Sequence, residues 1–354
     1  MIELKNAQWG QIRLADIFDE IPRGKVSDLK NVADGKTIII AASGVNEGFS
    51  CFSNDEPISK NAMTISFNGV GTGTAFVHNY LFNLNSDCGL VKPKENISLY
   101  ALRFIAVSIN QNKNKFNYGY KANESRILRQ TVLLPISDNG QPDYAFMEEF
   151  IKEREAVKRK QYLEYCKKQL EIVGGGYDLI PLKDKEWKSF FVVDVFDTIQ
   201  RGKRLKTADH VVGSIPYVSS SALNNGVDNF VSNDKGVRKF SDCLSLANSG
   251  SVGSTFYEPF EFVASDHVTH LKNEEFNKYH YLFLATMTSR LSQKYNFNRE
   301  INDKRISREI ILLPLNDEGV PDYEYMEQYS KNLLYKKLQS YINFVTNQID
   351  IVVI

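Results

Sequence analysis

The 354-residue sequence predicts a mixed α/β protein of two tandem globules separated by two long helices. We expect the helices to pair as an antiparallel coiled coil, which would relate the two halves by a pseudo-twofold axis. Three observations support this fold class. The sequence repeats itself once over the length of a whole domain, each copy carries short strand-like runs, and each copy ends in a long helical stretch.

The internal repeat is the strongest feature of the sequence. Residues 9–25 and 187–203 share the pattern W-x6-D-x-F-D-x-I-x-R-G-K, and further identities follow in the same order. The repeat is far longer than the unit of a solenoid protein, so it indicates two copies of one complete domain. The identities that close the two copies are Leu134-Pro135, Pro142-Asp143-Tyr144 and Met147-Glu148, then Leu313-Pro314, Pro321-Asp322-Tyr323 and Met326-Glu327.

Most of each copy has the pattern of short strands joined by turns. Apolar or alternating runs, such as 37–41 and 243–247, are bounded by Gly, Asn, Ser and Asp, which favour turns. One helical stretch follows in each copy, at 98–110 and 278–291, and a short strand then ends at the Leu-Pro pair. Each globule is therefore expected to contain more strand than helix.

Each copy ends in a long predicted helix that begins at a Pro-Asp pair, because proline suits the first helical turn and acidic side chains favour a helix N-terminus. Apolar positions then alternate at spacings of three and four, which is the seam pattern of a coiled coil. The first helix is expected to stop at 174–176, three glycines that would also make a flexible joint. The predicted seam residues are Leu163, Cys166, Leu170, Val173, Leu338, Ile342, Val345 and Ile349.

These features divide the chain into four predicted segments. The alternative is that each helix packs only on its own globule, but a seam of this length favours a partner helix. The segments are a first globule at 1–143, a first spacer helix at 144–176, a second globule at 177–322 and a second spacer helix at 323–354.

The composition indicates a cytoplasmic protein without membrane spans. No apolar run approaches the roughly 20 residues that a spanning helix needs, and the first ten residues do not resemble a signal peptide. Cys51, Cys88, Cys166 and Cys243 form no CxxC pair, so we expect reduced thiols and no metal site.

The charges balance overall but are segregated along the chain. There are 43 basic and 43 acidic residues, yet basic residues dominate 103–129, 201–206 and 290–308. A local basic field attracts phosphate even at zero net charge, because salt screens charges beyond about 10 Å.

No motif predicts a catalytic site or a bound cofactor. The segment 67–71, Phe-Asn-Gly-Val-Gly, fits the F-x-G-x-G loop that binds S-adenosylmethionine, but strand and turn patterns follow it instead of a helix. The chain lacks the G-x4-G-K-S/T motif of ATPases and an Asn/Asp-Pro-Pro-aromatic tetrapeptide. Glu186-Trp187-Lys188 could pass for a nuclease E-x-K, but Trp187 belongs to the repeat. We therefore expect a protein that is not itself an enzyme.

A DNA-binding surface is the hypothesis that remains. Segments 113–121 and 294–299 interleave basic and aromatic residues, and Lys and Arg can contact phosphates while Asn and Arg can read base edges. The alternative is aromatic packing beside a solvated face. The candidate DNA-binding residues are Arg23, Lys25, Lys113, Lys115, Lys121, Arg126, Arg201, Lys203, Arg204, Ser219, Ser220, Asn224, Asn225, Lys294, Arg299, Lys304 and Arg305.

Over essentially its whole length the chain resembles the specificity subunits of type I and type IIB restriction–modification systems. The likeness rests on the repeated pattern that begins at Trp9 and Trp187, on residues 213–226, on the turn at 250–253 and on the two closing segments. The resemblance implies that each globule is a target recognition domain and that together they read a bipartite site in double-stranded DNA.

The resemblance also implies partners. The paired helices would dock two modification (methyltransferase) subunits, which would carry the S-adenosylmethionine, and a restriction or translocase subunit could join them. It does not distinguish the type I from the type IIB organisation. The competing hypothesis is a non-catalytic scaffold of two globules on a coiled-coil spacer that does not read DNA.

Overall fold

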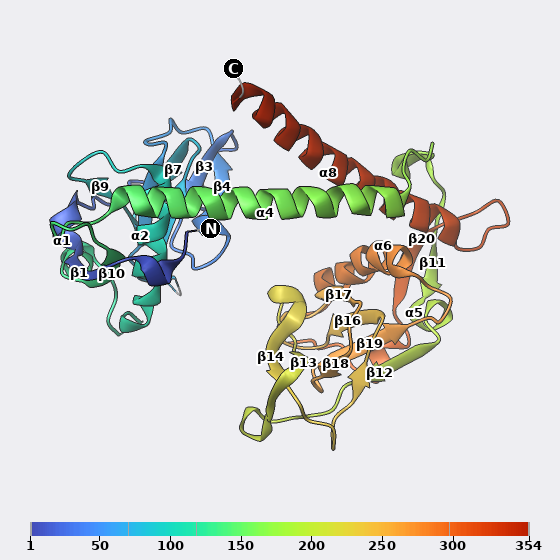
Figure 1. Ribbon diagram of the computed structural model, residues 1–354. Helices are drawn as coiled ribbons and strands as arrows, with labels where there is room; N and C mark the ends of the chain where they lie inside the picture. The colour runs from blue at the N-terminus through green and yellow to red at the C-terminus, as the bar shows by residue number, and fades with distance from the viewer. Residues whose placement is uncertain (1, 70, 118, 297, 353–354) are drawn as a thin grey trace. The chain divides into compact units, whose positions relative to one another are not determined.

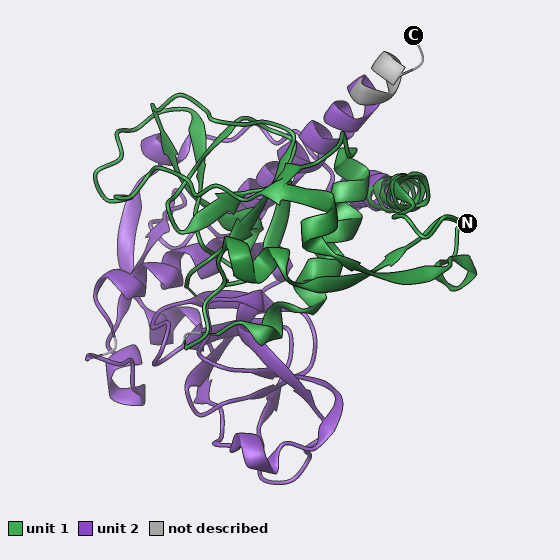
Figure 2. Ribbon diagram, turned by 90° about the vertical axis from the view of Figure 1, so that its left-hand side faces the viewer, with its two compact units in different colours: residues 1–162 green, residues 163–354 purple. Residues whose placement is uncertain are grey.

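The structure, a computed structural model, describes residues 2–69, 71–117, 119–296 and 298–352, with only the backbone for 348–352. The chain forms two compact units, Met1–Tyr162 and Leu163–Ile354 (Figure 2). The two units contain closely similar successions of elements, which confirms the tandem mixed α/β organisation. No described helix is both long and apolar enough to cross a membrane.

Unit 1 contains two small three-stranded sheets and two strand pairs (Figure 1). In one sheet, β3 lies between antiparallel β4 and parallel β7; in the other, β5 lies between β6 and β8 and is antiparallel to both. Strand β1 pairs with β10, and β2 pairs with β9. The bounds are β1 (Trp9–Arg13), β2 (Phe18–Glu20), β3 (Thr37–Ile40), β4 (Phe49–Ser53), β5 (Ala62–Ser66), β6 (Ala75–His78), β7 (Phe82–Leu84), β8 (Cys88–Leu90), β9 (Lys92–Pro93) and β10 (Thr131–Pro135).

Unit 2 repeats this plan with larger sheets. Its four-stranded sheets have the orders β12-β19-β16-β17 and β14-β13-β18-β15, and β11 pairs with β20 as β1 pairs with β10. The bounds are β11 (Trp187–Phe191), β12 (Thr198–Arg201), β13 (Val212–Val218), β14 (Val227–Val231), β15 (Lys239–Phe240), β16 (Cys243–Ala247), β17 (Thr255–Glu258), β18 (Phe262–Ala264), β19 (Val268–Lys272) and β20 (Ile310–Pro314).

One helix covers a sheet in each unit, α2 (Leu99–Gln111) in unit 1 and α6 (Lys278–Ser289) in unit 2. Both begin at capping residues, because the Ser98 hydroxyl and the Asn277 amide accept hydrogen bonds from otherwise unpaired N–H groups of the first turn. Short helices flank the core at α1 (Leu14–Ile17), α3 (Glu124–Leu128), α5 (Val192–Val195) and α7 (Asp303–Ile306).

The repeated sequence motif builds the two cores. Phe18 and Met147 are buried in the core of unit 1, and their counterparts Phe196 and Met326 are buried in the core of unit 2. Burial of apolar area is the main favourable term in folding, so these identities are explained by packing. They leave the loops between strands free to differ.

The long helices are α4 (Tyr144–Val173) and α8 (Tyr323–Val352). They begin where the sequence predicts, because Asp143 and Asp322 each accept a hydrogen bond of 2.9 Å from a backbone N–H of the first turn. Helix α4 belongs to unit 1 as far as Tyr162 and to unit 2 from Leu163 onward. The treatment of 144–176 and 323–354 as spacers distinct from the globules stays a prediction.

The last turns of α4 pack against α8 within unit 2. Cys166, Leu170 and Val173 form one apolar cluster with Leu338 and Ile342, all five from the predicted seam. Of the remaining predicted seam residues, Leu163 is partly buried and Val345 is buried. The side chain of Ile349 lies outside the described residues.

The glycine joint after α4 is followed at once by an anchor to α8. The amide of Asn332 accepts a hydrogen bond from the backbone N–H of Tyr177 at 3.1 Å and donates one to its carbonyl at 2.7 Å. The predicted flexible joint is therefore bounded on its C-terminal side by a fixed point within unit 2.

Candidate nucleic-acid interface

Three loops that are distant in sequence converge in unit 1. We name them loop A1 (41–48), loop B1 (67–74, with Val70 outside the described residues) and loop C1 (112–123, with Tyr118 likewise outside). Gly71 of B1 lies so close to A1 that a Cβ there would be 2.3 Å from the carbonyl carbon of Ser43. The backbone N–H of Ala122 in C1 donates to the hydroxyl of Thr72 in B1 at 3.0 Å. These contacts make one continuous surface from three loops.

Unit 2 repeats the arrangement with loop A2 (219–226), loop B2 (248–254) and loop C2 (293–302, with Phe297 outside the described residues). The backbone N–H of Ser251 in B2 donates to the carbonyl of Ser220 in A2 at 3.0 Å. The N–H of Ile301 in C2 donates to the carbonyl of Asn248 in B2, also at 3.0 Å. The same loops therefore meet in the same order in both units, although their sequences differ.

The tips of loops A1 and A2 share one backbone shape. Asn46 and Glu47 in unit 1, and Asn224 and Asn225 in unit 2, all have φ between 51° and 53°. Asn adopts this left-handed conformation more readily than most residues, which explains its recurrence. All four side chains are exposed, so each loop tip presents two hydrogen-bonding groups: Asn46 recurs as Asn224, whereas Glu47 is replaced by Asn225.

The two Arg-Gly-Lys turns are anchored beside loops B1 and B2. The guanidinium of Arg23 donates to the Ser86 carbonyl at 2.8 Å and lies 4.9 Å from the ring centre of Phe67. Arg201 donates to the Asp266 carbonyl at 3.0 Å. These predicted DNA-binding arginines are thus hydrogen-bonded to the protein, although Arg23 is exposed and Arg201 is partly exposed. Lys25, Lys203 and Arg204 are exposed as well.

A small hollow of about 290 Å³ opens next to Arg23. Phe67, Asn123 and Ser125 also border it, and Glu124 beside them accepts a hydrogen bond of 2.9 Å from the N–H of Ile21. A guanidinium, an amide and a hydroxyl at one hollow can donate hydrogen bonds to a phosphate or a base edge.

The basic-aromatic segments in loops C1 and C2 are arranged differently from the simple interleaving that the sequence suggests. Phe116 and Tyr295 are buried in their cores, so these rings pack inward instead of facing a ligand. Arg126 donates to the Lys121 carbonyl at 2.5 Å and lies 4.1 Å from the ring centre of Tyr120, and Arg305 similarly donates to the backbone of its own loop. Both arginines shape their loops.

Lys294, although its side chain is half exposed, is held by a buried carboxylate. Its ammonium group lies within hydrogen-bonding distance of both carboxylate oxygens of the buried Glu309, at 2.9 and 2.8 Å. The other exposed candidates of loops C1 and C2 and of the following α7 are Lys113, Lys115, Lys121, Arg299 and Lys304.

Ser219 and Ser220, also predicted to contact DNA, are partly buried at the base of loop A2. The carbonyl of Ser220 and the N–H of Ser219 are both used in loop contacts, the latter with Gly226 at 2.8 Å. Asn224 and Asn225 are the exposed members of that stretch. The structure therefore separates residues that build the loop from residues that its tip presents.

Two further side chains at this surface were not predicted. The ring Nδ1 of His267, a half-exposed side chain, lies 2.7 Å from the Ser249 hydroxyl in loop B2. Arg238 donates to the Arg201 carbonyl at 2.6 Å. Neither occurs in both copies, so the repeat carries no signal that could have identified them.

A hydrogen-bonded chain links loop A1 to a buried histidine. The Glu47 carboxylate accepts a hydrogen bond of 3.2 Å from the Tyr80 hydroxyl, and that hydroxyl lies 3.0 Å from His78 Nδ1. On the other side of the ring, His78 Nε2 lies 2.8 Å from the Thr64 hydroxyl. Burial lowers the pKa of His78 to about 4, so the ring is neutral at pH 7. Burial and the Glu47 carboxylate raise the pKa of Tyr80 to about 12.

In unit 2, Glu258 stands at the position that His78 has in unit 1, and Ser245 stands at that of Thr64. The Ser245 hydroxyl donates a hydrogen bond of 2.8 Å to the Glu258 carboxylate. Burial raises the pKa of this carboxyl to about 7. The two units therefore bury titratable groups of opposite type at one position of the shared fold. Among the described residues, no group of three or more His, Cys, Asp or Glu could hold a metal ion.

The sequence matches the family model for the type I restriction modification DNA specificity domain twice, over residues 6–165 and 184–343. The chain belongs to this family. It is a restriction–modification specificity subunit with two recognition domains, and each match contains one set of the converging loops. The two-globule scaffold hypothesis receives no support from this result.

Known proteins of the same kind are similar over nearly the full length. A protein of Heyndrickxia coagulans, named as Type II restriction enzyme BgcI specificity subunit S.BcgI, is 29% identical over 321 residues, which cover 86% of this chain and 92% of the relative. The crystal structure of a type I restriction-modification system S subunit from M. genitalium is 14% identical, covers 99% of this chain and 96% of its own, and has a TM-score of 0.48. The HsdS subunit from Thermoanaerobacter tengcongensis is 11% identical, with coverages of 94% and 90% and a TM-score of 0.33.

Proposed function

We propose that this specificity subunit reads a bipartite sequence in double-stranded DNA, with one half-site recognised by the loops of each unit. The observation that carries the proposal is the repeated convergence of three loops on one scaffold, with different exposed side chains in the two copies. Two different half-sites need different hydrogen-bonding side chains on the two units, because base edges are distinguished by their donor and acceptor patterns.

Different residues have different roles in this proposal. The exposed Lys25, Lys113, Lys115, Lys203 and Lys304 contact phosphates, which position the protein without reading sequence. Asn225 and Arg299 are the best candidates for base contacts in unit 2, because they are exposed and unit 1 has other residues at their positions. Asn224 is exposed too, but unit 1 has the same residue there, Asn46, so it suits a role common to both units. Arg23 and Arg201 are shared by both units, so they suit phosphate contact.

The subunit itself carries no chemistry in this proposal and acts in the cytoplasm with partner enzymes. Two modification subunits, which bind the S-adenosylmethionine, would dock on the long helices, and a restriction subunit could join the complex. The apolar cluster of α4 with α8 supports an antiparallel coiled coil as the spacer. Each 30-residue helix is about 45 Å long, which is enough to separate two half-sites by one turn of B-DNA, ~34–36 Å.

The test is to co-express the chain with the modification subunit of its own locus and to map methylated adenines on host DNA. The proposal expects a split motif with a fixed unread gap that is lost when this chain is omitted. Exchange of loops A2 and C2 for those of another specificity subunit should change one half of the motif only. Methylation that is unchanged without the chain would contradict the proposal.

A further inference from the structure

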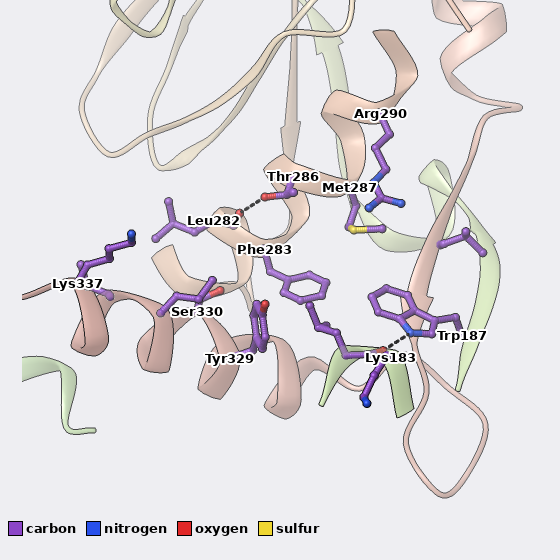
Figure 3. Close-up of a pocket in the computed structure, with 14 residues that line it drawn as sticks. Lys183, Trp187, Leu282, Phe283, Thr286, Met287, Arg290, Tyr329, Ser330 and Lys337 are labelled. Atoms are coloured by element: carbon purple, nitrogen blue, oxygen red, sulfur yellow. Dashed lines mark hydrogen bonds between the residues drawn. The ribbon is translucent and has the colours of Figure 1, made fainter. Parts of the chain in front are cut away.

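A groove of about 650 Å³ opens in unit 2 between α6, α8 and the strands β11 and β20 (Figure 3). Three rings run along it: Trp187 lies 6.3 Å from Phe283, and Phe283 lies 5.8 Å from Tyr329, measured between ring centres. Leu312 and Leu333 on its walls are 46% and 48% exposed. Leucines so exposed in a concave site lined by aromatic rings are typical of an interaction surface, because apolar area of this kind gains from being covered.

Unit 1 builds the same row of rings but places charges beside it. Trp9 lies 6.2 Å from Phe104, and Phe104 lies 5.7 Å from Phe150. Where unit 2 has Leu282 and Leu334, however, unit 1 has Arg103 and Glu155, which form an ion pair of 2.8 Å. The repeat thus retains the row of rings in both units, while in unit 1 an ion pair stands where unit 2 has two leucines.

The charges at the groove of unit 2 have a single sign. Lys183, Arg290 and Lys337 line it, and no Asp or Glu does. No ion pair joins any of the three to another part of the chain that the structure describes. Figure 3 shows them around the rings of Trp187, Phe283 and Tyr329. An apolar floor bordered by unpaired cations complements a ligand that is apolar on one face and acidic beside it.

The position of the groove indicates which partner supplies that ligand. Leu334 lines the groove and also packs against the apolar cluster between α4 and α8, so the groove adjoins the proposed spacer helices. We infer that the groove of unit 2 binds an amphipathic helix of the modification subunit, with apolar side chains toward the rings and Asp or Glu beside Lys183, Arg290 and Lys337. This inference rests on the proposed function, which supplies the partner.

A helix in such a groove would use apolar residues one turn apart as anchors, and Trp and Tyr are the residues that contribute most to binding at such surfaces. The counterpart in unit 1, where the Arg103–Glu155 ion pair replaces two leucines, would offer that copy of the partner less apolar surface. The inference therefore predicts two unequal binding steps for the modification subunit.

The experiment uses a matched pair of variants, Leu312→Asp in the groove and Leu133→Asp at the equivalent position of β10 in unit 1. Both residues are about half exposed, at 46% and 53%, so neither change should disturb a core. Each variant is co-expressed with the modification subunit, and the complex is measured by light scattering for mass and by titration for affinity. We expect Leu312→Asp to weaken one binding step at least tenfold and Leu133→Asp to leave both steps within about twofold of wild type.

Salt provides a second readout that a folding defect cannot imitate. Association of the wild-type chain should weaken with rising salt, and the variant Lys183→Ala/Arg290→Ala/Lys337→Ala should lose most of that dependence. Equal affinity of the two Asp variants, or an unchanged salt dependence in the triple variant, overturns the inference.

If these results appear while wild-type methylation still depends on the chain, the proposed function stands and only the groove assignment fails. A wild-type chain that neither binds the modification subunit nor directs methylation would remove both.

Discussion

The ammonium group of Lys294 in loop C2 lies 2.8 Å from a carboxylate oxygen of Glu309, a residue that is only 5% exposed. The hydroxyl of the adjacent Tyr295 donates to the same carboxylate. Glu309 directly precedes β20, and its carbonyl accepts a hydrogen bond of 2.9 Å from the N–H of Val192. One buried carboxylate therefore fastens a candidate DNA-binding loop to the core of unit 2.

Lys294→Ala should reduce stability more than it changes DNA readout, because it leaves the Glu309 carboxylate buried without its cation. We expect the free energy of unfolding to fall by about 1–3 kcal/mol, the usual cost of an unsatisfied buried polar group. Urea denaturation measures the loss, and Lys294→Ala/Glu309→Gln should recover part of it. If Lys294→Ala left stability unchanged but weakened DNA binding, Lys294 would instead be assigned a phosphate contact.

Arg299→Ala should affect recognition of one half-site. The Arg299 side chain is exposed beside the buried Tyr295, with its guanidinium 5.2 Å from the ring centre, so its removal leaves the core intact. A lost base contact costs about 1–3 kcal/mol and relaxes specificity at one position. Methylation mapping with the variant should show degeneracy in a single half of the motif. Equal loss of activity at every site would indicate a phosphate contact instead.

Lys113→Ala/Lys115→Ala should weaken binding to all DNA sequences alike. Both lysines are exposed on a short 3-10 turn in loop C1, where they can release counterions from phosphates. Each lost phosphate contact should reduce the slope of log K against log salt by about 0.9. Titration of the complex at several salt concentrations tests this, and a slope equal to that of the wild type would exclude the pair from the DNA interface.

Stability should respond to pH in opposite directions through His78 and Glu258. The pKa of His78 is lowered to about 4 in the folded protein. As pH falls, the imidazole is therefore protonated in the unfolded chain before it is protonated in the folded one, and stability falls as pH drops from about 6.5 towards 4. The pKa of Glu258 is raised to about 7, so the folded chain keeps its proton longer and stability falls as pH rises from about 4.5 to 7. Each contribution is at most about 3 kcal/mol.

The matched variants are His78→Gln and Glu258→Gln, measured by urea denaturation between pH 5 and pH 8. Relative to wild type, His78→Gln should be most favourable at pH 5 and Glu258→Gln most favourable at pH 8. Differences from wild type that are the same at both pH values would show that neither group titrates as its burial implies.

The sequence by itself determined the features that depend on neighbouring residues. Asp143 and Asp322 cap the helices that they were expected to begin, because a cap involves only groups within one turn. The repeated Phe18 and Phe196 are buried as the duplication of a domain requires, since a core position is repeated whenever the fold is. The presence of two domains and their specificity-subunit family were readable from the same pattern.

Only the tertiary structure decided which polar and charged groups are free to act. Lys294 and Arg299 lie five residues apart in one basic segment and both are exposed, yet the ammonium group of Lys294 is held by the buried Glu309 carboxylate. The partner of Lys294 comes from outside the loop, and no local pattern specifies such a contact. Likewise, Leu182, Leu282 and Leu333 line one groove only because the fold brings three distant segments together. Charge pairing and concavity are non-local properties, and packing of the whole unit decides them.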